Sequence, residues 1–249
     1  MELILIGSGT GVPSLKRGGP SILLKSGANN VLVDCGLGIL HKLLKIGLTC
    51  NDIDTLLFTH IHPDHTAELV SLLFASKSPE MLRTKPLKIV GGEGFIDFYN
   101  KLRGVYGSWI EPQSFSIDIS EKVGETFTID DLRISTVKTN HSQESVAFAI
   151  NTANKKIVIS GDTGYCQGIV NIAKDADLLL LECSLPDNKG VAGHLTPSEV
   201  VRIAEETNCK KLVIYHLYPS CDASNPLVEI KKRWPGEVIG GSDMLNIHL

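Results

Sequence analysis

Several features are missing from this 249-residue sequence, and each absence excludes a class of protein. No apolar run approaches the ~18 residues that a membrane-spanning helix needs, so we expect no membrane partner. The composition, with 43% hydrophobic and 21% charged residues, excludes a collagen, a coiled coil and a disordered tail. Internal repeats, low-complexity segments and Pro/Ser-rich linkers are absent too. Since no linker divides the chain, we interpret residues 1–249 as a single domain.

We also expect no export signal. The first five residues, Met1 to Leu5, have no basic region and no cleavage site, so no secretion signal is predicted. None of the six cysteines forms a Cys-x-x-Cys pair, and in a chain of this length we expect free thiols in a reducing cytoplasm. These cysteines are Cys35, Cys50, Cys166, Cys183, Cys209 and Cys221.

An excess of basic charge is absent. The chain has 24 Lys and Arg against 28 Asp and Glu, which gives a formal net charge of −4. Binding to nucleic acid is driven by neutralisation of phosphates, so this balance gives no general attraction to RNA or DNA. Only a local basic patch would provide it.

Short apolar runs and turn residues predict many strands mixed with helices. Strands are predicted at 3–6, 21–25, 30–34, 54–59, 87–90, 146–150, 156–159, 177–181, 211–215 and 245–249, with an antiparallel sheet over 115–137. Helices are predicted at 38–46, 66–76, 94–103, 197–207 and 226–234, the fourth opened by a Thr196-Pro-Ser-Glu199 capping box. Both halves of the chain mix strands with helices. This mixture favours an α/β fold with sheet packed on sheet and helices outside.

The densest chemical signal is Thr-His-Ile-His-Pro-Asp-His at 59–65, directly after a predicted buried strand. Residues two apart in an extended segment point to the same side, so His60 and His62 can bind one ion. Pro63 bends the chain, and Asp64 and His65 can then face a second ion nearby. Imidazole suits zinc, and a carboxylate adds an oxygen ligand.

Three more candidate ligands end predicted strands. His141 follows one strand, Asp162 lies in a Gly-Asp-Thr-Gly turn, and His216 ends another. Taken singly, each is also typical of a surface or turn residue. Their repeated placement at strand ends favours convergence on one site. Asp34, also at a strand end, fits either a support for the metal loop or an ordinary turn.

The motif His-x-His-x-Asp-His at 60–65, followed by His141, Asp162 and His216, resembles the metallo-β-lactamase superfamily. The segments 6–14 with Arg17, the Asp-Cys-Gly at 34–36, and the segments 181–184 and 193–196 resemble its ribonuclease Z-like branch. The resemblance implies an αββα sandwich of two mixed sheets with helices outside. It covers nearly the whole chain.

The resemblance also implies a pair of metal ions. His60, His62 and His141 would hold the first, and Asp64, His65 and His216 the second. Asp162 would bridge both. We expect two Zn²⁺, with Mn²⁺ or Fe also accepted by such ligands. Homologues of this branch often pair, so we expect a homodimer.

Two such ions predict a hydrolase that attacks an ester bond with a metal-bridged hydroxide. Asp64 is placed to orient the water or take its proton. His194 is the candidate donor to the leaving alkoxide, and Glu182 would hold its imidazole in one orientation. A helix begins just after His194, and its N–H groups favour an anionic phosphate.

The substrate predicted is a small phosphodiester, such as a cyclic phosphate or nucleotide. Ribonuclease Z carries a long tRNA-gripping arm between the positions that match His141 and Asp162, but here only the twenty residues 142–161 lie there. Pro63 also stands where ribonuclease Z commonly has Gly. The alternatives are tRNA 3′-processing by a ribonuclease Z, hydrolysis of a lactone or thioester, and a non-enzymatic metal-binding protein, against which the complete ligand set and His194 argue.

Overall fold

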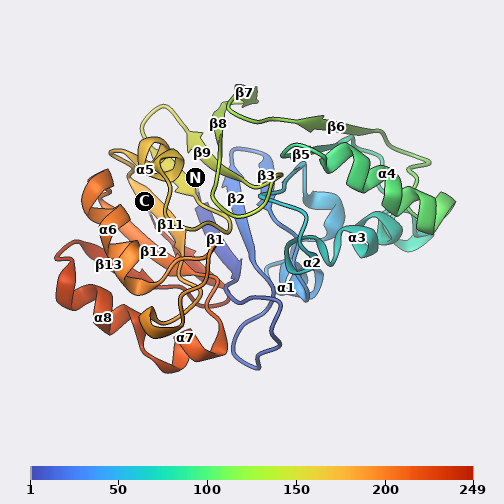
Figure 1. Cartoon of the computed structure of the whole chain (residues 1–249). Helices are drawn as coiled ribbons and strands as arrows, with labels where there is room; N and C mark the ends of the chain where they lie inside the picture. The colour runs from blue at the N-terminus through green and yellow to red at the C-terminus, as the bar shows by residue number, and fades with distance from the viewer. Residues whose placement is uncertain (1, 249) are drawn as a thin grey trace.

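The computed structural model describes residues 2–248, which form two sheets packed face to face with helices on both outer sides (Figure 1). The first sheet has the order β14-β1-β2-β3-β4-β5-β6, and the second has the order β13-β12-β11-β10-β9-β8-β7. The first sheet's strands are β1 Glu2–Gly7, β2 Ser21–Ser26, β3 Asn29–Val33, β4 Thr55–Leu57, β5 Leu87–Gly91, β6 Ile117–Glu121 and β14 Leu245–Ile247. The second sheet's are β7 Thr126–Ile129, β8 Leu132–Lys138, β9 Val146–Asn151, β10 Lys156–Ile159, β11 Leu178–Glu182, β12 Lys211–Tyr215 and β13 Glu237–Gly240.

The helices lie between and after these strands. They are α1 Ile39–Lys45, α2 Pro63–Thr66, α3 Leu69–Ala75, α4 Phe95–Tyr106, α5 Gln167–Ala173, α6 Pro197–Thr207, α7 Pro219–Ala223 and α8 Pro226–Arg233. Four short 3-10 helices are η1 Cys50–Asp52, η2 Pro79–Met81, η3 Gly107–Trp109 and η4 Asp187–Lys189. None of the helices described is both long and apolar enough to cross a membrane.

Alternation of side chains along the strands builds three apolar layers. In β11, Leu178 and Leu180 face the first sheet, whereas Leu179 and Leu181 face the helices α5 and α6. Successive strand residues point to opposite faces, so a strand buried on both sides is apolar throughout. A third cluster packs the first sheet against α1, α3 and α4. The three apolar layers hold two sheets and two outer sets of helices together, which is the predicted αββα sandwich.

The predicted elements are found with shifts of a few residues, and two predictions differ more from the structure. The strands over 115–137 do not form one antiparallel sheet: β6 pairs in parallel with β5 in the first sheet, and β7 and β8 form a hairpin in the second. An alternating pattern identifies a strand but not its partner. The helix expected at 66–76 is two helices, and the first begins at Pro63 because proline suits the first helical position.

The chain ends are partly outside the described residues. The strand expected at 245–249 is β14, which pairs antiparallel with β1, while Leu249 lies outside the described residues, as does Met1 of the N-terminal segment. The six cysteines are free thiols, as expected. The twenty residues 142–161 hold β9, a turn and β10, so they leave no room for an inserted arm.

Strand direction fixes where the site lies. The strands β3 and β4 run parallel to each other, and so do β10, β11 and β12. Their carboxyl ends therefore meet at one edge of the sandwich. The segments that follow these strands carry the polar side chains that the sequence singles out.

Candidate metal centre

All seven predicted ligands converge at the carboxyl ends of the strands. The loop after β4 carries His60 and His62, and α2 carries Asp64 and His65. The other three follow strands of the second sheet: His141 lies after β8, Asp162 after β10 and His216 after β12. The site thus joins loops from both sheets. The ligand atoms form two groups, each with its atoms within 4.8 Å of one another, and a third group of the same kind joins His194 to Asp162 and His216.

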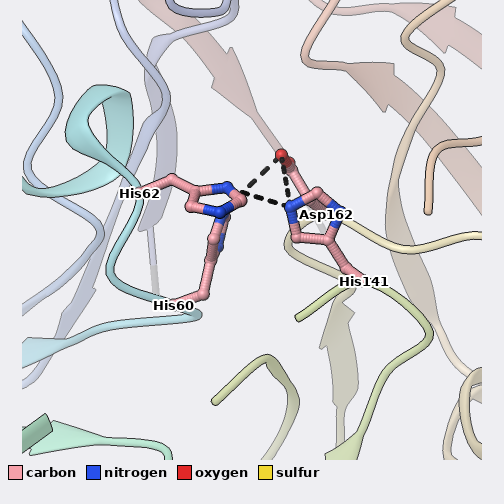
Figure 2. Close-up of side chains that lie close together, drawn as sticks. All are labelled: His60, His62, His141 and Asp162. Carbon is pink, nitrogen blue, oxygen red and sulfur yellow. Dashed lines mark hydrogen bonds and ion pairs between the residues drawn. The ribbon is translucent and has the colours of Figure 1, made fainter. Parts of the chain in front are cut away.

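The first group contains His60, His62, His141 and Asp162, whose side chains point toward one another from three segments, with His60 and His62 on the same loop (Figure 2). His62 Nδ1 lies 3.0 Å from His141 Nε2. Asp162 Oδ2 lies 3.7 Å from His60 Nε2 and 3.8 Å from His141 Nε2. Three ring nitrogens and one carboxylate oxygen therefore surround one point.

The second group contains Asp64, His65 and His216. The Nε2 atoms of His65 and His216 lie 3.3 Å apart, and Asp64 Oδ2 lies 3.4 Å from His216 Nε2. Asp162 Oδ1 is 3.3 Å from His216 Nε2 and 3.4 Å from His65 Nε2. Asp162 thus turns one oxygen toward each group, which is the arrangement of a bridging carboxylate.

The donor atoms fit divalent cations. Among the described residues, the buried His60 Nε2 and Asp162 Oδ1 have no hydrogen-bond partner. Unpaired buried polar atoms are costly, and a cation between them supplies the missing partner. Burial, and then the neighbouring His65, hold the pKa of His60 well below its ordinary value. His60 is therefore a neutral imidazole, the form that binds a metal.

The two aspartates are ionised. Burial opposes ionisation of Asp162, but the neighbouring His216 and His65 hold its pKa well below the ordinary value. Burial also opposes ionisation of Asp64, yet its hydrogen bond with His216 and the charge of His65 lower the pKa to about 2. Both carboxylates are thus negatively charged at neutral pH and offer the charge that a cation needs.

His194 and Glu182 form a hydrogen-bonded pair beside the two groups. The ring of His194 lies nearly parallel to that of His216, with centroids 5.9 Å apart, and its Nδ1 is 3.0 Å from Glu182 Oε1. Burial alone would lower the pKa of His194, but the Glu182 carboxylate raises it above the ordinary value. Glu182 is wholly buried, and this burial raises its own pKa.

The helix start near His194 is not an open anion site. The N–H of Ser198, in the first turn of α6, donates to Asp187 Oδ1, and the N–H of Thr196 donates to Glu199. The capping box predicted from the sequence is confirmed, but the phosphate site expected at this helix start is wrong. Two carboxylates already take the N–H groups that the phosphate would need.

Three further side chains contact the ligands; sequence reasoning weighed Asp34 but did not single out Thr59 or Ser184. Asp34 is settled as a support, because its Oδ2 lies 2.8 Å from His65 Nδ1. The hydroxyls of Thr59 and Ser184 lie 3.0 Å from Nδ1 of His60 and of His216, respectively. A hydroxyl residue next to a predicted ligand in the sequence is a weak signal, and it would have pointed to Thr59, which directly precedes His60.

A cavity of about 470 Å³ lies beside Asp64. The N-terminal loop, the segment before α1 and the helix α2 form its walls. Its lining residues include Pro13, Leu37, Pro63 and Ala67. The candidate centre therefore has a neighbouring space that a small molecule can enter.

The sandwich and its His/Asp cluster define a metallo-hydrolase of the metallo-β-lactamase superfamily, in the ribonuclease Z-like branch. Within this class, the family model described as "Anti-Pycsar protein Apyc1" matches residues 1–229, and the chain belongs to this family.

Relatives found by sequence and by structure support the same classification. The chain is 29% identical over 242 residues to the probable metallo-hydrolase YhfI of Bacillus subtilis, covering 96% of both chains. It is 27% identical to a ribonuclease Z of Mycobacterium sp. (strain KMS), covering 88% of this chain and 85% of that one. The crystal structure of Bacillus subtilis YhfI matches with a TM-score of 0.86 and 26% identity, over 99% of this chain and 98% of that one.

The likeness to more distant neighbours shows the fold. The human tRNase Z short form matches with a TM-score of 0.80 at 24% identity, over 100% of this chain and 99% of that one. A diphosphatase of the PhnP family matches with a TM-score of 0.77 at 19% identity, over 100% of this chain and 97% of that one.

Proposed function

We propose that this protein is a dizinc phosphodiesterase that hydrolyses a small phosphodiester, such as a cyclic phosphate or nucleotide. The observation that carries the proposal is Asp162, whose two oxygens face two separate groups of imidazoles. One carboxylate shared between two such groups is the arrangement expected of a two-metal hydrolase.

The proposed ligands follow the two groups. His60, His62 and His141 would hold one ion, Asp64, His65 and His216 the other, and Asp162 both. Zinc suits this set of nitrogens with few oxygens, and Mn²⁺ or Fe would also be accepted. When bound, two such cations neutralise a phosphate and lower the pKa of water from 15.7 toward about 7.

Side chains of this protein supply the proton steps. Asp64 is ionised and partly exposed beside the cavity, so it can orient the attacking water and accept its proton. As the new P–O bond forms, the bond to the leaving oxygen breaks. His194 donates its Nε2 proton to that oxygen, because Nδ1 remains bonded to Glu182, whose negative charge favours the doubly protonated ring.

Substrate size follows from what surrounds the centre. The neighbouring cavity has a volume of about 470 Å³, within the range of small-molecule sites. The segment 142–161, where ribonuclease Z carries its arm, is taken up by β9, β10 and their turn. The net charge of −4 gives no general attraction to a polyanion. Together these features favour a small phosphodiester over tRNA.

A second candidate is tRNA 3′-processing. It is supported by the relatives named ribonuclease Z, of which one spans 88% of this chain. A lactone or thioester hydrolase remains a third candidate on the same centre. A non-enzymatic metal-binding protein is disfavoured. Such a protein needs only the metal ligands, whereas here a hydrogen-bonded pair of His194 and Glu182 also lies beside them.

The deciding experiment combines metal analysis with a substrate panel. We expect close to two metal ions per chain and turnover of bis-p-nitrophenyl phosphate. Cyclic nucleotides and ribose phosphates should be hydrolysed faster than a tRNA precursor. Specific cleavage of a tRNA precursor, with no turnover of small diesters, would instead support the second candidate. Activity on a lactone with failure on every phosphodiester would contradict the proposal.

Three further proposals concern domain organisation, assembly and location in the cell. We propose that residues 1–249 act as one domain, because the proposed ligand set draws on both sheets. We also propose a homodimer in a cytoplasmic setting. Sedimentation of the purified chain tests the first of these two, and cell fractionation tests the second.

A further inference from the structure

Two buried carboxylates lie behind the candidate centre, one from each sheet. Asp34 follows β3 and is 3% exposed, and Glu182 ends β11 and is wholly buried. Each accepts a hydrogen bond directly from one imidazole. His65 Nδ1 lies 2.8 Å from Asp34 Oδ2, and His194 Nδ1 lies 3.0 Å from Glu182 Oε1. The two sheets therefore support the centre in the same way.

A hydroxyl also connects each carboxylate to a second imidazole. Thr59 Oγ1 lies 2.8 Å from Asp34 Oδ2 and 3.0 Å from His60 Nδ1. On the opposite sheet, Ser184 Oγ is hydrogen-bonded to Glu182 Oε2 and lies 3.0 Å from His216 Nδ1. The pattern carboxylate, hydroxyl, imidazole thus occurs twice.

The direction of these hydrogen bonds follows from counting protons. A hydroxyl has one proton and two lone pairs, and an ionised carboxylate only accepts. The hydroxyl proton goes to the carboxylate, since charged acceptors form the stronger bonds. The hydroxyl oxygen is then left to accept, so the N–H of the imidazole must be at Nδ1. With a cation in place of the proton that His216 Nε2 shares with Asp64, His60 and His216 would therefore both present a bare Nε2.

That bare nitrogen faces the centre in both cases. His60 Nε2 is buried without a hydrogen-bond partner among the described residues and lies 3.7 Å from Asp162 Oδ2. His216 Nε2 lies 3.3 Å from Asp162 Oδ1. With Nδ1 as the donor, each ring offers its lone pair to a cation and cannot rotate without losing its bond to the hydroxyl.

We propose that Thr59 and Ser184 are positioning residues, one for each of the two cations. Thr59 holds His60 for the first group, and Ser184 holds His216 for the second. The inference rests on the proposed two-metal site and adds which side chains fix the tautomer of its ligands. Ser184 also joins that ligand to the carboxylate that holds His194, so both rings depend on Glu182.

Zinc binding tests the proposal without reference to activity. Ser184→Ala and Thr59→Val each remove one hydroxyl, and Thr59→Val keeps the shape of the side chain. The two stepwise zinc constants are measured by competition with a coloured chelator. We expect each variant to weaken one step by about 10–100-fold, the usual effect of losing a group that orients a metal ligand. Ser184→Thr and Thr59→Ser keep the hydroxyl and should restore binding.

Double variants assign each hydroxyl to its ion. In a His216→Ala background Ser184 has no ring left to hold, so adding Ser184→Ala should change the remaining constant by less than about 3-fold. In the same background Thr59→Val should still weaken it. Non-additivity of this kind is expected only for groups that act through each other.

The outcomes separate the inference from the proposed function. A wild-type chain that binds no zinc overturns both. A wild type that binds two ions, with constants unchanged in Ser184→Ala and Thr59→Val, overturns the inference alone. The inference alone is also overturned if a variant weakens both zinc-binding steps equally and its metal-free form unfolds more easily. That result would mean that the hydroxyl has a merely structural role.

Discussion

At the scale of the residue, the chemistry depends on which atom of each ring faces the centre. His62 presents Nδ1 to the first group, whereas His60, His141 and His216 present Nε2. Each Nε2 ring is held by its other nitrogen, and His141 Nδ1 is 2.8 Å from the carbonyl oxygen of Gly193. A metal ligand whose second nitrogen is bonded keeps one tautomer and one orientation.

His194 is the residue whose replacement is most informative. We predict that His194→Ala lowers the turnover of bis-p-nitrophenyl phosphate by about 10²–10⁴-fold, the range of a general acid. Metal content should be preserved, since the seven proposed ligands do not include this ring. Steady-state rates and metal analysis of the same sample check both points. His41→Ala, on an exposed position of α1, is the matched control, and unchanged turnover in His194→Ala would contradict the role.

At the scale of the element, loops rather than helices and strands decide the shape of the site. Residues 8–20 have no regular structure, but Arg17 donates two hydrogen bonds to Asp222 in α7, at 2.9 and 2.8 Å. The same loop walls the cavity beside Asp64. A loop anchored in this way keeps the cavity open in a fixed shape.

We predict that Asp222→Asn lowers the free energy of unfolding by about 1–2 kcal/mol at neutral pH, because it breaks a two-point ion pair that is mostly shielded from solvent. The hydrogen bonds from Arg17 hold the pKa of Asp222 below its ordinary value. The stabilisation is therefore full above the unfolded value of about 3.9 and is lost as the pH falls through the lower folded value.

Urea unfolding at pH 7 and near pH 3 measures this difference. The gap between wild type and Asp222→Asn should be clear at pH 7 and close toward acid. Asp118→Asn, at an exposed position of β6, is the control and should behave like wild type at both values. A gap that stays constant with pH would show that the ion pair is not its cause.

At the scale of the whole molecule, the proposed ions would join the two sheets. The first sheet contributes His60, His62, Asp64 and His65, and the second contributes His141, Asp162 and His216. A ligand that binds only the folded chain stabilises it by mass action. Metal binding at this centre would therefore be coupled to folding across the interface between the sheets.

We predict that zinc at 100 times its dissociation constant raises the free energy of unfolding by about 2.7 kcal/mol per site, and that a chelator reverses the gain. Urea unfolding with and without zinc measures it. A chain carrying both Asp162→Ala and His216→Ala is the control and should gain much less. If wild type and control respond alike, the ion does not bind at this centre.

The sequence by itself determined the local part of the site. Two histidines two residues apart after a buried strand must share a side, and the proline that follows must turn the chain, because these constraints act between neighbours. Alternation and apolar runs likewise determined the strands and their layers. The capping box at Thr196 set the start of α6 for the same reason.

Only the tertiary structure decided what meets at long range. It brought His141, Asp162 and His216 to the 60–65 loop, and it moved β6 into the first sheet beside β5. It also filled the start of α6 with Asp187. These contacts join segments that are separate along the chain, and they depend on strand order and direction, which no local pattern encodes.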